Sequence, residues 1–424
     1  MSGQGRVFEK CARRLIPLMV VLYIVNFLDR VNVGFAALAM NKELGFSPSV
    51  YGVGAGALFV GFFAFSVPST VILEKFGARR WLFVTLTVWG ALSTSTALVR
   101  SPFEFYLLRF LLGAAEAGFI PGMIVYLTYW FPQTYRARFG AGFLIAQPIS
   151  FIIGSPLSGV ILGMDGVFSL SGWQWLFLLE GLPSVVLAAI VLLILPDAPA
   201  QASWLSTAEK QEIAARLSAE NRAEHSELWR ALLDPRVIAL GAVNFGILFG
   251  LYGITLWLPQ IVQAMGFSTL GTSFIVALPF IASVPAMIFW GRSSDRRAER
   301  IWHVALPLLL AAAGFLAASA SSSNAVSLLA LSVALIGMYP TLAPIINLPS
   351  SFLGGQASAA GTALCYAIGS LGAFFGPSMI GVLKELTGGY AVAMAALATA
   401  LVIAAIIVLA VGRAMTPRAG FRPA

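Results

Sequence analysis

The sequence contains few charged residues, two histidines and two cysteines. Only 10% of its 424 residues are Asp, Glu, Lys or Arg, whereas a soluble protein of this length carries about a quarter. His225 and His303 stand in no nucleophile–base or metal-ligand pattern, so the sequence argues against an enzyme and against a metal or cofactor site. Cys11 and Cys365 are too few to predict a disulfide framework or a zinc site.

Hydrophobic residues dominate the chain instead. They make up 59% of it, and the sequence also contains 41 Gly and 22 Pro. Twelve apolar runs are long enough to cross a bilayer, which takes about 20 residues. We therefore predict an all-α membrane protein with twelve transmembrane helices, present in the lipid bilayer as a monomer. In chain order the runs are 15–39, 50–73, 81–99, 104–130, 138–162, 173–195, 235–262, 270–291, 302–320, 325–348, 357–382 and 389–412.

The basic residues follow the membrane topology and do not form a nucleic-acid-binding surface. The net charge is +8, but the Lys and Arg residues are scattered between the hydrophobic runs. Placing the N-terminus in the cytoplasm puts most of the 26 Lys and Arg residues on that side, as the positive-inside rule requires. We predict that both termini are cytoplasmic and that the protein binds no nucleic acid.

Two charged loops are related by an internal repeat. Glu74 and Asp295 are 221 residues apart, and Pro156 and Pro377 have the same separation. Transporters that are built from repeats place their substrate near the middle of the membrane, between the repeats. We therefore predict two pseudo-symmetric six-helix bundles joined by a cytoplasmic linker. The boundaries are 1–196 for the first bundle, 197–234 for the linker and 235–424 for the second bundle.

The linker contains one predicted helix. Ser206 and Glu209 have the spacing of a capping box, in which each side chain bonds the backbone N–H of the other residue. This spacing predicts an amphipathic helix from Thr207 to about Asn221. We expect the helix to lie along the cytoplasmic face.

Several stretches resemble one known family. The loop 74–80, EKFGARR, resembles the signature loop of the major facilitator superfamily, although Thr70 and Glu74 stand where that family usually has Gly and Asp. Four stretches are similar to the anion:cation symporter family within it. The resemblance implies the major facilitator fold and the inner (plasma) membrane of a bacterium. It also implies transport of organic anions, as in the bacterial permeases for tartrate, phthalate and 4-hydroxyphenylacetate. The stretches are 26–36 (NFLDRVNVGFA), 107–118 (LLRFLLGAAEAG), 173–181 (WQWLFLLEG) and 204–210 (WLSTAEK).

Five ionisable residues lie inside the hydrophobic runs, where unpaired charges cost several kcal/mol and usually face a cavity. Arg109 and Glu116 are seven residues apart and share one helix face. Asp29 and Arg30 are neighbours, separated by about 100° around their helix, so they point in different directions. We predict that Asp29 pairs with Arg109, while Arg30 presents its planar donors to a substrate carboxylate. The five residues are Asp29, Arg30, Arg109, Glu116 and Glu180.

Glu116 and Asp29 are the predicted proton carriers. Burial favours the neutral form of a carboxyl group, whereas a neighbouring arginine favours the charged form. A carboxyl group between these two effects can take up a proton on one side of the membrane and release it on the other. The alternative is an ion pair that holds two helices together without titrating. For Glu180 we expect a structural or gating role.

The remaining candidates are neutral residues in the spans and charged residues in the two repeated loops. Besides Arg30 and Arg109, the predicted substrate contacts are Asn26, Gln147, Asn347, Tyr366 and Ser370. Each could instead form a helix–helix hydrogen bond or a packing contact; for Gln147, substrate contact is what the family resemblance implies. The predicted cytoplasmic gating residues are Glu74, Arg79, Asp295, Arg296 and Arg300. A solvated charge run is the alternative for these loops.

The sequence therefore predicts a secondary active transporter that takes up a small organic carboxylate together with protons, by alternating access. The alternative is an organic-anion exchanger or facilitator with the same fold. Phe62, Ile346 and Tyr366 stand where sugar-acid transporters of the resembled family have Tyr, Trp and Asn. These replacements favour an aromatic acid or a dicarboxylate over a polyhydroxylated acid.

Overall fold

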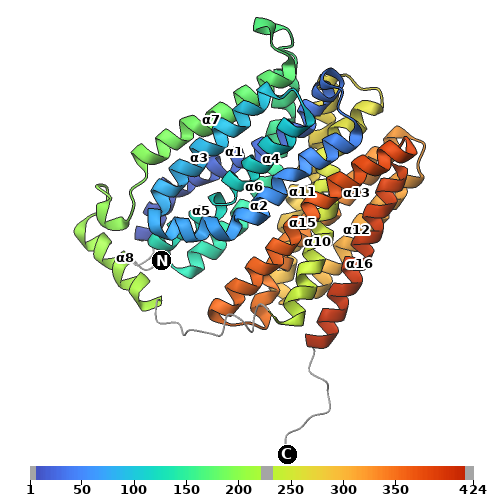
Figure 1. Cartoon of the computed structure of the whole chain (residues 1–424). Coiled ribbons are helices and arrows are strands. Elements are labelled where there is room, and N and C mark those ends of the chain that lie inside the picture. Colours follow the sequence, from blue (N-terminus) through green and yellow to red (C-terminus); the bar gives the residue numbers. More distant parts are fainter. Residues whose placement is uncertain (1–5, 221–232, 416–424) are drawn as a thin grey trace, which may run out of the picture. The chain divides into compact units, whose positions relative to one another are not determined.

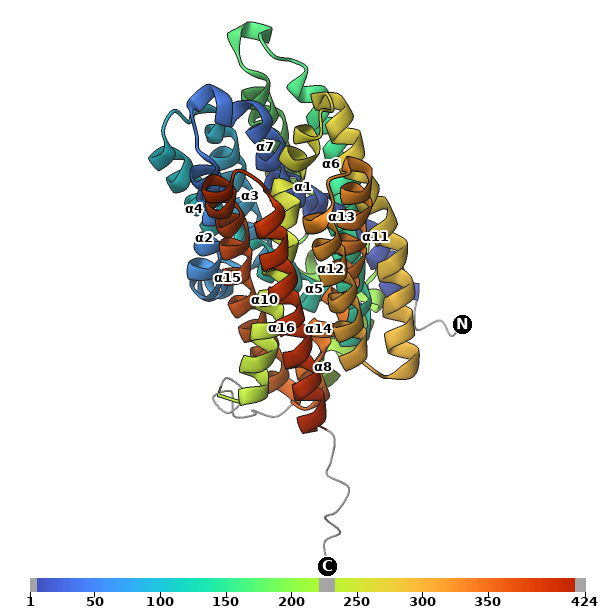
Figure 2. The same cartoon turned by 90° about the vertical axis from the view of Figure 1, so that its right-hand side faces the viewer.

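The computed structural model describes residues 6–220 and 233–415, and both segments are built from α-helices. Within them, twelve helical segments are long and apolar enough to cross a membrane, so the predicted all-α fold with twelve spans is confirmed (Figures 1 and 2). The first helix also includes the polar residues that precede its apolar run, and it begins at Arg6. The first six spans are formed by α1 (Arg6–Leu44), α2 (Pro48–Phe76), α3 (Ala78–Ser95), α4 (Pro102–Glu116) with α5 (Phe119–Trp130), α6 (Gln133–Leu162) and α7 (Gly172–Ile194).

The remaining six spans follow the linker helix α8 (Thr207–Glu220). The tenth span is divided into two α-helices by a short 3-10 turn at Tyr339–Thr341. These spans are α10 (Pro235–Ala264), α11 (Thr269–Arg297), α12 (Ile301–Ala320), α13 (Asn324–Met338) with α14 (Leu342–Asn347), α15 (Gly355–Thr387) and α16 (Ala391–Met415).

The chain divides into two compact units. The first takes its residues from Met1–Glu224 and Thr255–Ile281, and the second from His225–Ile254 and Ala282–Ala424. In the first unit α2 packs against α4, α3 packs against α7, and α1 contacts both α6 and α7. In the second unit α12 packs between α13 and α16. One end of α10 and one end of α11 therefore belong to the first unit.

Two glycines let α2 and α4 approach closely. A Cβ atom on Gly113 would lie 1.7 Å from the Leu58 carbonyl oxygen, and one on Gly61 would lie 2.0 Å from the Phe110 carbonyl oxygen. Neither position could hold a side chain without moving a backbone. This contact fixes the face of α4 that carries Arg109 and Glu116.

The fourth span is interrupted immediately after Glu116. Helix α4 ends there, and α5 begins at Phe119. The Trp81 indole Nε1 donates a hydrogen bond of 2.9 Å to the Gly118 carbonyl oxygen, which also accepts one of 3.0 Å from the Gly122 N–H. Glu116 consequently occupies the last position of a helix in the middle of a transmembrane span.

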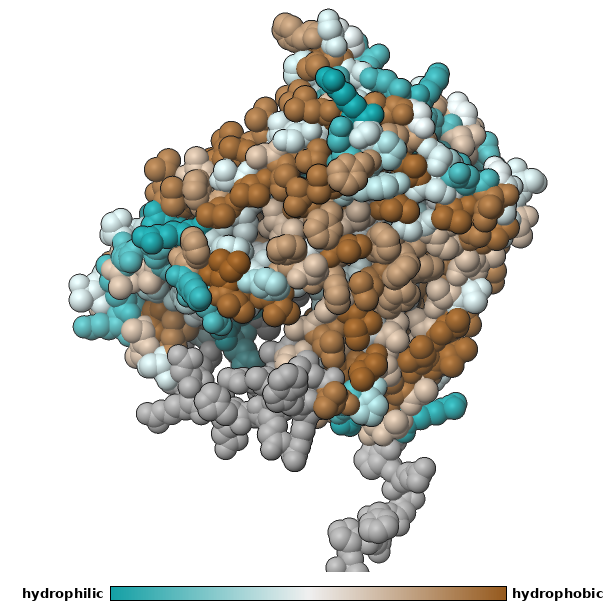
Figure 3. Space-filling model, viewed as in Figure 1, coloured by the Kyte–Doolittle hydropathy of each residue, from teal (hydrophilic) through white to brown (hydrophobic). Residues whose placement is uncertain are grey.

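Large apolar side chains remain exposed on the outward faces of the helices, as a lipid-facing surface requires. Figure 3 shows such residues over much of one face. Val186 on α7, Phe289 on α11 and Ile406 on α16 are examples, with exposed fractions of 59%, 70% and 60%.

The linker helix begins as predicted. Ser206 N–H donates to Glu209 Oε2 at 2.8 Å, and Glu209 N–H donates to Ser206 Oγ at 3.2 Å, which confirms the capping box. Lys10 Nζ on α1 donates to Glu209 Oε1 and Oε2 at 2.9 and 2.8 Å. The Trp204 ring stacks on Trp130, with ring centroids 5.6 Å apart. These contacts join α8 to the first unit, while linker residues 221–232 lie outside the described residues.

The Lys10–Glu209 pair should make the docking of α8 dependent on pH. The hydrogen bonds from Lys10 lower the pKa of Glu209 from its ordinary value of 4.5. A carboxylate with a lowered pKa stabilises docking fully above its ordinary value, and this contribution is lost as the pH falls through the lowered value. We therefore expect Lys10→Gln to increase amide hydrogen exchange in residues 207–220 at pH 7 and to have less effect near pH 3.

The matched control is Arg13→Gln, which removes the same charge from an exposed side chain on the same helix. Equal hydrogen exchange in the two variants at pH 7 would contradict a role for the pair.

Candidate functional site

Asp29 is fully buried, and each of its carboxylate oxygens accepts two hydrogen bonds. Since an ionised carboxylate has about four acceptor positions, all of them are occupied. The donors come from α1, α3 and α7, so Asp29 holds these three helices together. They are Ser93 Oγ at 2.6 Å and Asn32 Nδ2 at 3.3 Å on Oδ1, and Trp89 Nε1 at 2.6 Å and Ser184 Oγ at 3.1 Å on Oδ2.

The predicted pair between Asp29 and Arg109 is therefore wrong. In the part of the chain that the structure describes, no hydrogen bond or ion pair joins them. The physical reason is the rotation of α1. Asp29 points toward α3 and α7, and its neighbour Arg30 points toward α4.

Arg30 forms an ion pair with Glu116. Its Nε lies 2.6 Å from Glu116 Oε2, and the two side chains are 2% and 0% exposed. The Phe27 and Phe62 rings lie 5.1 and 5.2 Å from the guanidinium carbon, within the range of cation–π attraction. Arg30 is predicted to bind substrate, and here its Nε donor is paired with a protein carboxylate, so the substrate role stays a prediction. Residues 29 and 30 point in different directions, as predicted.

Arg109 is a buried cation for which the described part of the chain provides no hydrogen-bonding partner. Its side chain is 1% exposed, and its Nε and Nη1 have no acceptor among the described residues. The charges that act on it belong to Glu116, Tyr51, Asp29 and Arg30. Burying an arginine without an acceptor is expensive, so such a group indicates a site for an anion. The predicted role of Arg109 in substrate binding remains a proposal that this geometry favours.

Three further groups near these helices have unused hydrogen-bonding capacity. Both amide atoms of Asn26, and Glu116 Oε1, are buried with no hydrogen-bonding partner among the residues that the structure describes. Asn26 precedes Arg30 by one turn and shares its face of α1. The buried Gln147 on α6 makes no side-chain hydrogen bond to any described residue. These groups, with Arg109, could bind a ligand that both donates and accepts hydrogen bonds.

Glu180 has a different environment. Its Oε1 accepts a hydrogen bond of 2.9 Å from Ser158 Oγ on α6. The contact joins α6 to α7, in agreement with the structural role that the sequence favours.

The candidates in the second unit have local partners. Ser370 Oγ donates to the Ala367 carbonyl oxygen of its own helix at 2.7 Å, and Tyr366 is half-buried on the same helix. Asn347 is exposed at the end of α14, where its Nδ2 donates to the Ala343 carbonyl oxygen at 2.9 Å. The predicted substrate contact of Asn347 stays a prediction, with its side chain at the end of α14.

The predicted gating residues fall into two local groups. Arg79 Nη1 lies 3.0 Å from Asp197 Oδ2, and its Nη2 donates to the Leu192 carbonyl oxygen, so the first loop is joined to the end of α7. Arg300 Nη1 donates to the Asn347 carbonyl oxygen at 2.9 Å. The other three, whose side chains are exposed and form no ion pair within residues 6–220 and 233–415, are Glu74, Asp295 and Arg296.

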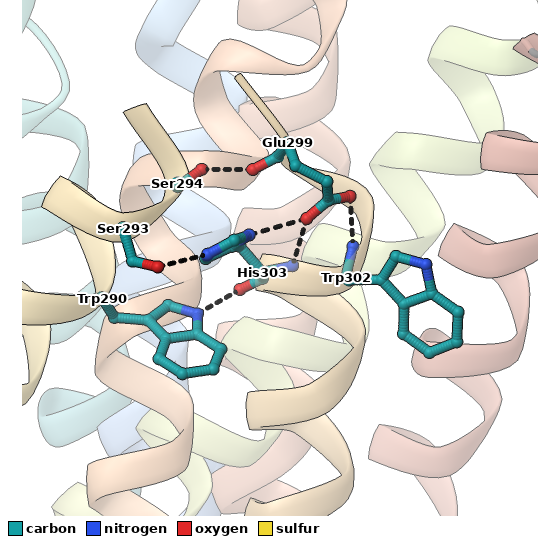
Figure 4. A network of polar contacts seen from close by, with 6 residues as sticks. All are labelled: Trp290, Ser293, Ser294, Glu299, Trp302 and His303. Atoms are coloured by element: carbon teal, nitrogen blue, oxygen red, sulfur yellow. Dashed lines mark hydrogen bonds and ion pairs between the residues drawn. The ribbon is translucent and has the colours of Figure 1, made fainter. Parts of the chain in front are cut away.

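The second loop also contains a network that the sequence analysis missed (Figure 4). Glu299 accepts from the backbone N–H groups of Trp302 and His303 at 2.8 and 3.2 Å, and its Oε2 lies 2.6 Å from His303 Nδ1. Burial raises the pKa of Glu299, but the hydrogen bonds outweigh this effect and lower it overall. The capping contact explains where α12 begins, and the spacing of Glu299 from Trp302 was the signal for it.

The same network places His303 Nε2 3.1 Å from Ser293 Oγ. A serine, histidine and glutamate in this order resemble a hydrolase triad. Ser293 lies within α11, however, where the backbone N–H groups are used in helix hydrogen bonds. Since an acyl-transfer site needs free N–H donors for its oxyanion, we interpret the network as structural.

Comparison with known proteins identifies the family. The model of the Major Facilitator Superfamily matches residues 19–377. The chain belongs to this superfamily. It is thus a membrane transporter and not an enzyme, and the family resemblance noted in the sequence is confirmed.

Two curated relatives are similar to the chain in sequence, and one solved structure is similar to it in fold. A putative tartrate transporter of Agrobacterium vitis is 46% identical over 98% of this chain and 97% of its own. A quinolone resistance transporter of Acinetobacter baumannii is 39% identical over 92% of this chain and 91% of its own. The crystal structure of a bacterial homologue of the human lysosomal transporter Spinster, inward-facing and occupied, is similar with a TM-score of 0.79. At 18% identity over 97% of this chain and 98% of that one, it supports the fold alone.

Proposed function

We propose that this Major Facilitator Superfamily member takes up a small organic carboxylate together with protons across the bacterial plasma membrane, with both termini in the cytoplasm. The observation that carries the proposal is Arg109, a buried guanidinium whose Nε and Nη1 have no acceptor within residues 6–220 and 233–415. Two relatives from Agrobacterium vitis are named putative tartrate transporters, and tartrate is an organic anion, in agreement with this proposal.

A carboxylate fits Arg109 chemically. The planar guanidinium presents parallel N–H donors that match the two oxygens of a carboxylate. The unpartnered donors Nε and Nη1 lie on adjacent nitrogens, so one carboxylate can satisfy both. A neutral sugar would leave the buried charge uncompensated. Asn26 and Gln147 would then bind polar groups elsewhere on the same substrate.

The proton is assigned to Glu116 in preference to Asp29. A proton on Asp29 would require the Ser93 or Ser184 hydroxyl to turn from donor to acceptor, because Trp89 Nε1 and Asn32 Nδ2 can only donate. Glu116 Oε1 accepts no hydrogen bond from any described residue, which leaves room for a proton on this oxygen. Protonating Glu116 also removes the charge that holds Arg30.

This arrangement gives a physical route to coupling. Once Glu116 is neutral, Arg30 becomes a second cation that can attract the substrate anion. Proton binding then strengthens anion binding, and by linkage anion binding strengthens proton binding to the same extent. The two are therefore taken up and released together.

An exchanger is the second candidate, because the Arg30–Glu116 distance of 2.6 Å is also what a permanent ion pair would have. In that case the pair never opens, and the anion crosses the membrane without a proton. Net uptake that follows an imposed pH gradient, without a counter-anion, separates symport from exchange.

Ligand binding to the purified protein tests the substrate class. We expect tartrate and benzoate each to raise the melting temperature, by an amount that grows with the logarithm of concentration above Kd. Tartramide and benzamide are the matched neutral controls. Stabilisation by the amides, or by neutral sugars and not by the acids, would overturn the anion assignment.

A further inference from the structure

Tyr51 connects the candidate anion site to α10. It lies in the first turn of α2 and is fully buried. Its hydroxyl donates a hydrogen bond of 2.6 Å to the carbonyl oxygen of Leu256. Leu256 belongs to the end of α10 that is part of the first unit. The Trp257 ring meets the Tyr51 ring edge-on, with centroids 4.8 Å apart.

The Leu256 carbonyl is also the point at which α1 approaches α10. A Cβ atom on Gly34 would lie 3.0 Å from this oxygen. Pro259, inside α10, has no N–H group, so the helix hydrogen bonds are interrupted close to this position. The contact is thus made close to a break in the hydrogen bonding of α10, where the helix backbone is held less firmly.

Tyr51 also lies on α2, the helix that packs against α4 and so against the helix that carries Arg109. The Gly61 and Gly113 contacts hold these two helices together. A phenolic hydroxyl that reaches a carboxylate bound at Arg109 would be a further donor for it.

We propose that Tyr51 is a substrate-positioning residue whose hydroxyl alternates between the Leu256 carbonyl, as in this structure, and a carboxylate bound at Arg109. The inference rests on the proposed function. A carboxylate accepts a stronger hydrogen bond than a peptide carbonyl. Substrate is therefore held tightly while Tyr51 is released from α10. It is held more weakly once the contact with Leu256 forms, which favours release of substrate in that state.

The test is Tyr51→Phe, which keeps the ring and removes only the hydroxyl. We expect the Kd for carboxylates to rise about ten- to a hundredfold, the size of one hydrogen bond to a charged group. A cysteine at Ala55, one turn from Tyr51 and fully buried, reports on the Leu256 contact. Its labelling by a membrane-impermeant maleimide should become several times faster in the Tyr51→Phe background.

Tyr126→Phe is the matched control. The Tyr126 hydroxyl is also buried in the first unit and donates to a backbone carbonyl, that of Pro196, at 2.9 Å. Its loss should change neither carboxylate affinity nor labelling at position 55.

The possible results separate this inference from the proposed function. Unchanged affinity in Tyr51→Phe overturns the positioning role, and faster labelling alone would then reveal a purely structural hydrogen bond. Weaker binding with unchanged labelling overturns the alternation between two partners. If Arg109→Gln still binds carboxylates, the proposed function itself fails. If that variant loses binding while Tyr51→Phe keeps it, only the assignment of Tyr51 fails.

Discussion

Replacing Arg109 with glutamine should weaken carboxylate binding at least about 30-fold, because a buried charged contact contributes about 2–5 kcal/mol. The same change should leave the unfolding temperature of the ligand-free protein unchanged or higher. Arg109 has no hydrogen-bonding acceptor among the described residues, so its removal leaves no protein group newly unpaired. Isothermal titration and thermal unfolding of the purified protein measure the two quantities.

Arg30→Gln is the matched control and should behave in the opposite way. It removes the partner of Glu116 and leaves that carboxylate buried without its cation. Breaking a buried pair from one side costs about 3–5 kcal/mol, so this variant should unfold at a clearly lower temperature. Arg109→Lys keeps the charge and loses the planar donors, and should bind with intermediate affinity. If Arg109→Gln destabilises the protein as much as Arg30→Gln does, Arg109 is a structural residue and not a substrate ligand.

The helices themselves could be predicted from the sequence because their signals are local. Length and hydropathy define a transmembrane span without reference to its neighbours. The capping box of Ser206 and Glu209 likewise depends only on a spacing of three residues, and it is present in the structure.

The partners of the buried charges could not be predicted in the same way. Axial levels along α1 and α4 brought Asp29 near Arg109, but a hydrogen bond also depends on how each helix is rotated. The donors that bind Asp29 are mostly neutral residues on other helices, Trp89 and Ser184 among them. An inventory of charges overlooks such donors, and so it gave Asp29 the wrong partner.

The isolation of Arg109 is also a property of the whole packing arrangement. From the sequence, two positive and three negative residues in the spans nearly balance one another. In the structure Asp29 accepts hydrogen bonds from neutral donors, and Glu116 forms an ion pair with Arg30. No described residue then provides an acceptor for Nε and Nη1 of Arg109. The group that best indicates the substrate could therefore be recognised only after the other pairs were known.

Glu116→Gln should abolish uptake driven by a pH gradient and leave exchange of substrate across the membrane intact. Glutamine has nearly the shape of a protonated glutamate, and its amide oxygen can still accept the hydrogen bond from Arg30 Nε. The variant should therefore fold and bind substrate. Uptake into proteoliposomes with an imposed pH gradient, compared with counterflow under equal pH, measures the two modes separately.

Glu180→Gln is the matched control for this change, since Glu180 is an equally buried carboxylate on α7 that bonds Ser158 and no arginine. It should retain gradient-driven uptake. Equal loss of uptake and exchange in Glu116→Gln would mean that Glu116 only holds α1 to α4. Unchanged gradient-driven uptake would place the proton elsewhere, with Asp29 as the next candidate despite its four donors. Selective loss of the gradient-driven mode is the result expected if opening of the Arg30–Glu116 pair is the step that couples proton to anion.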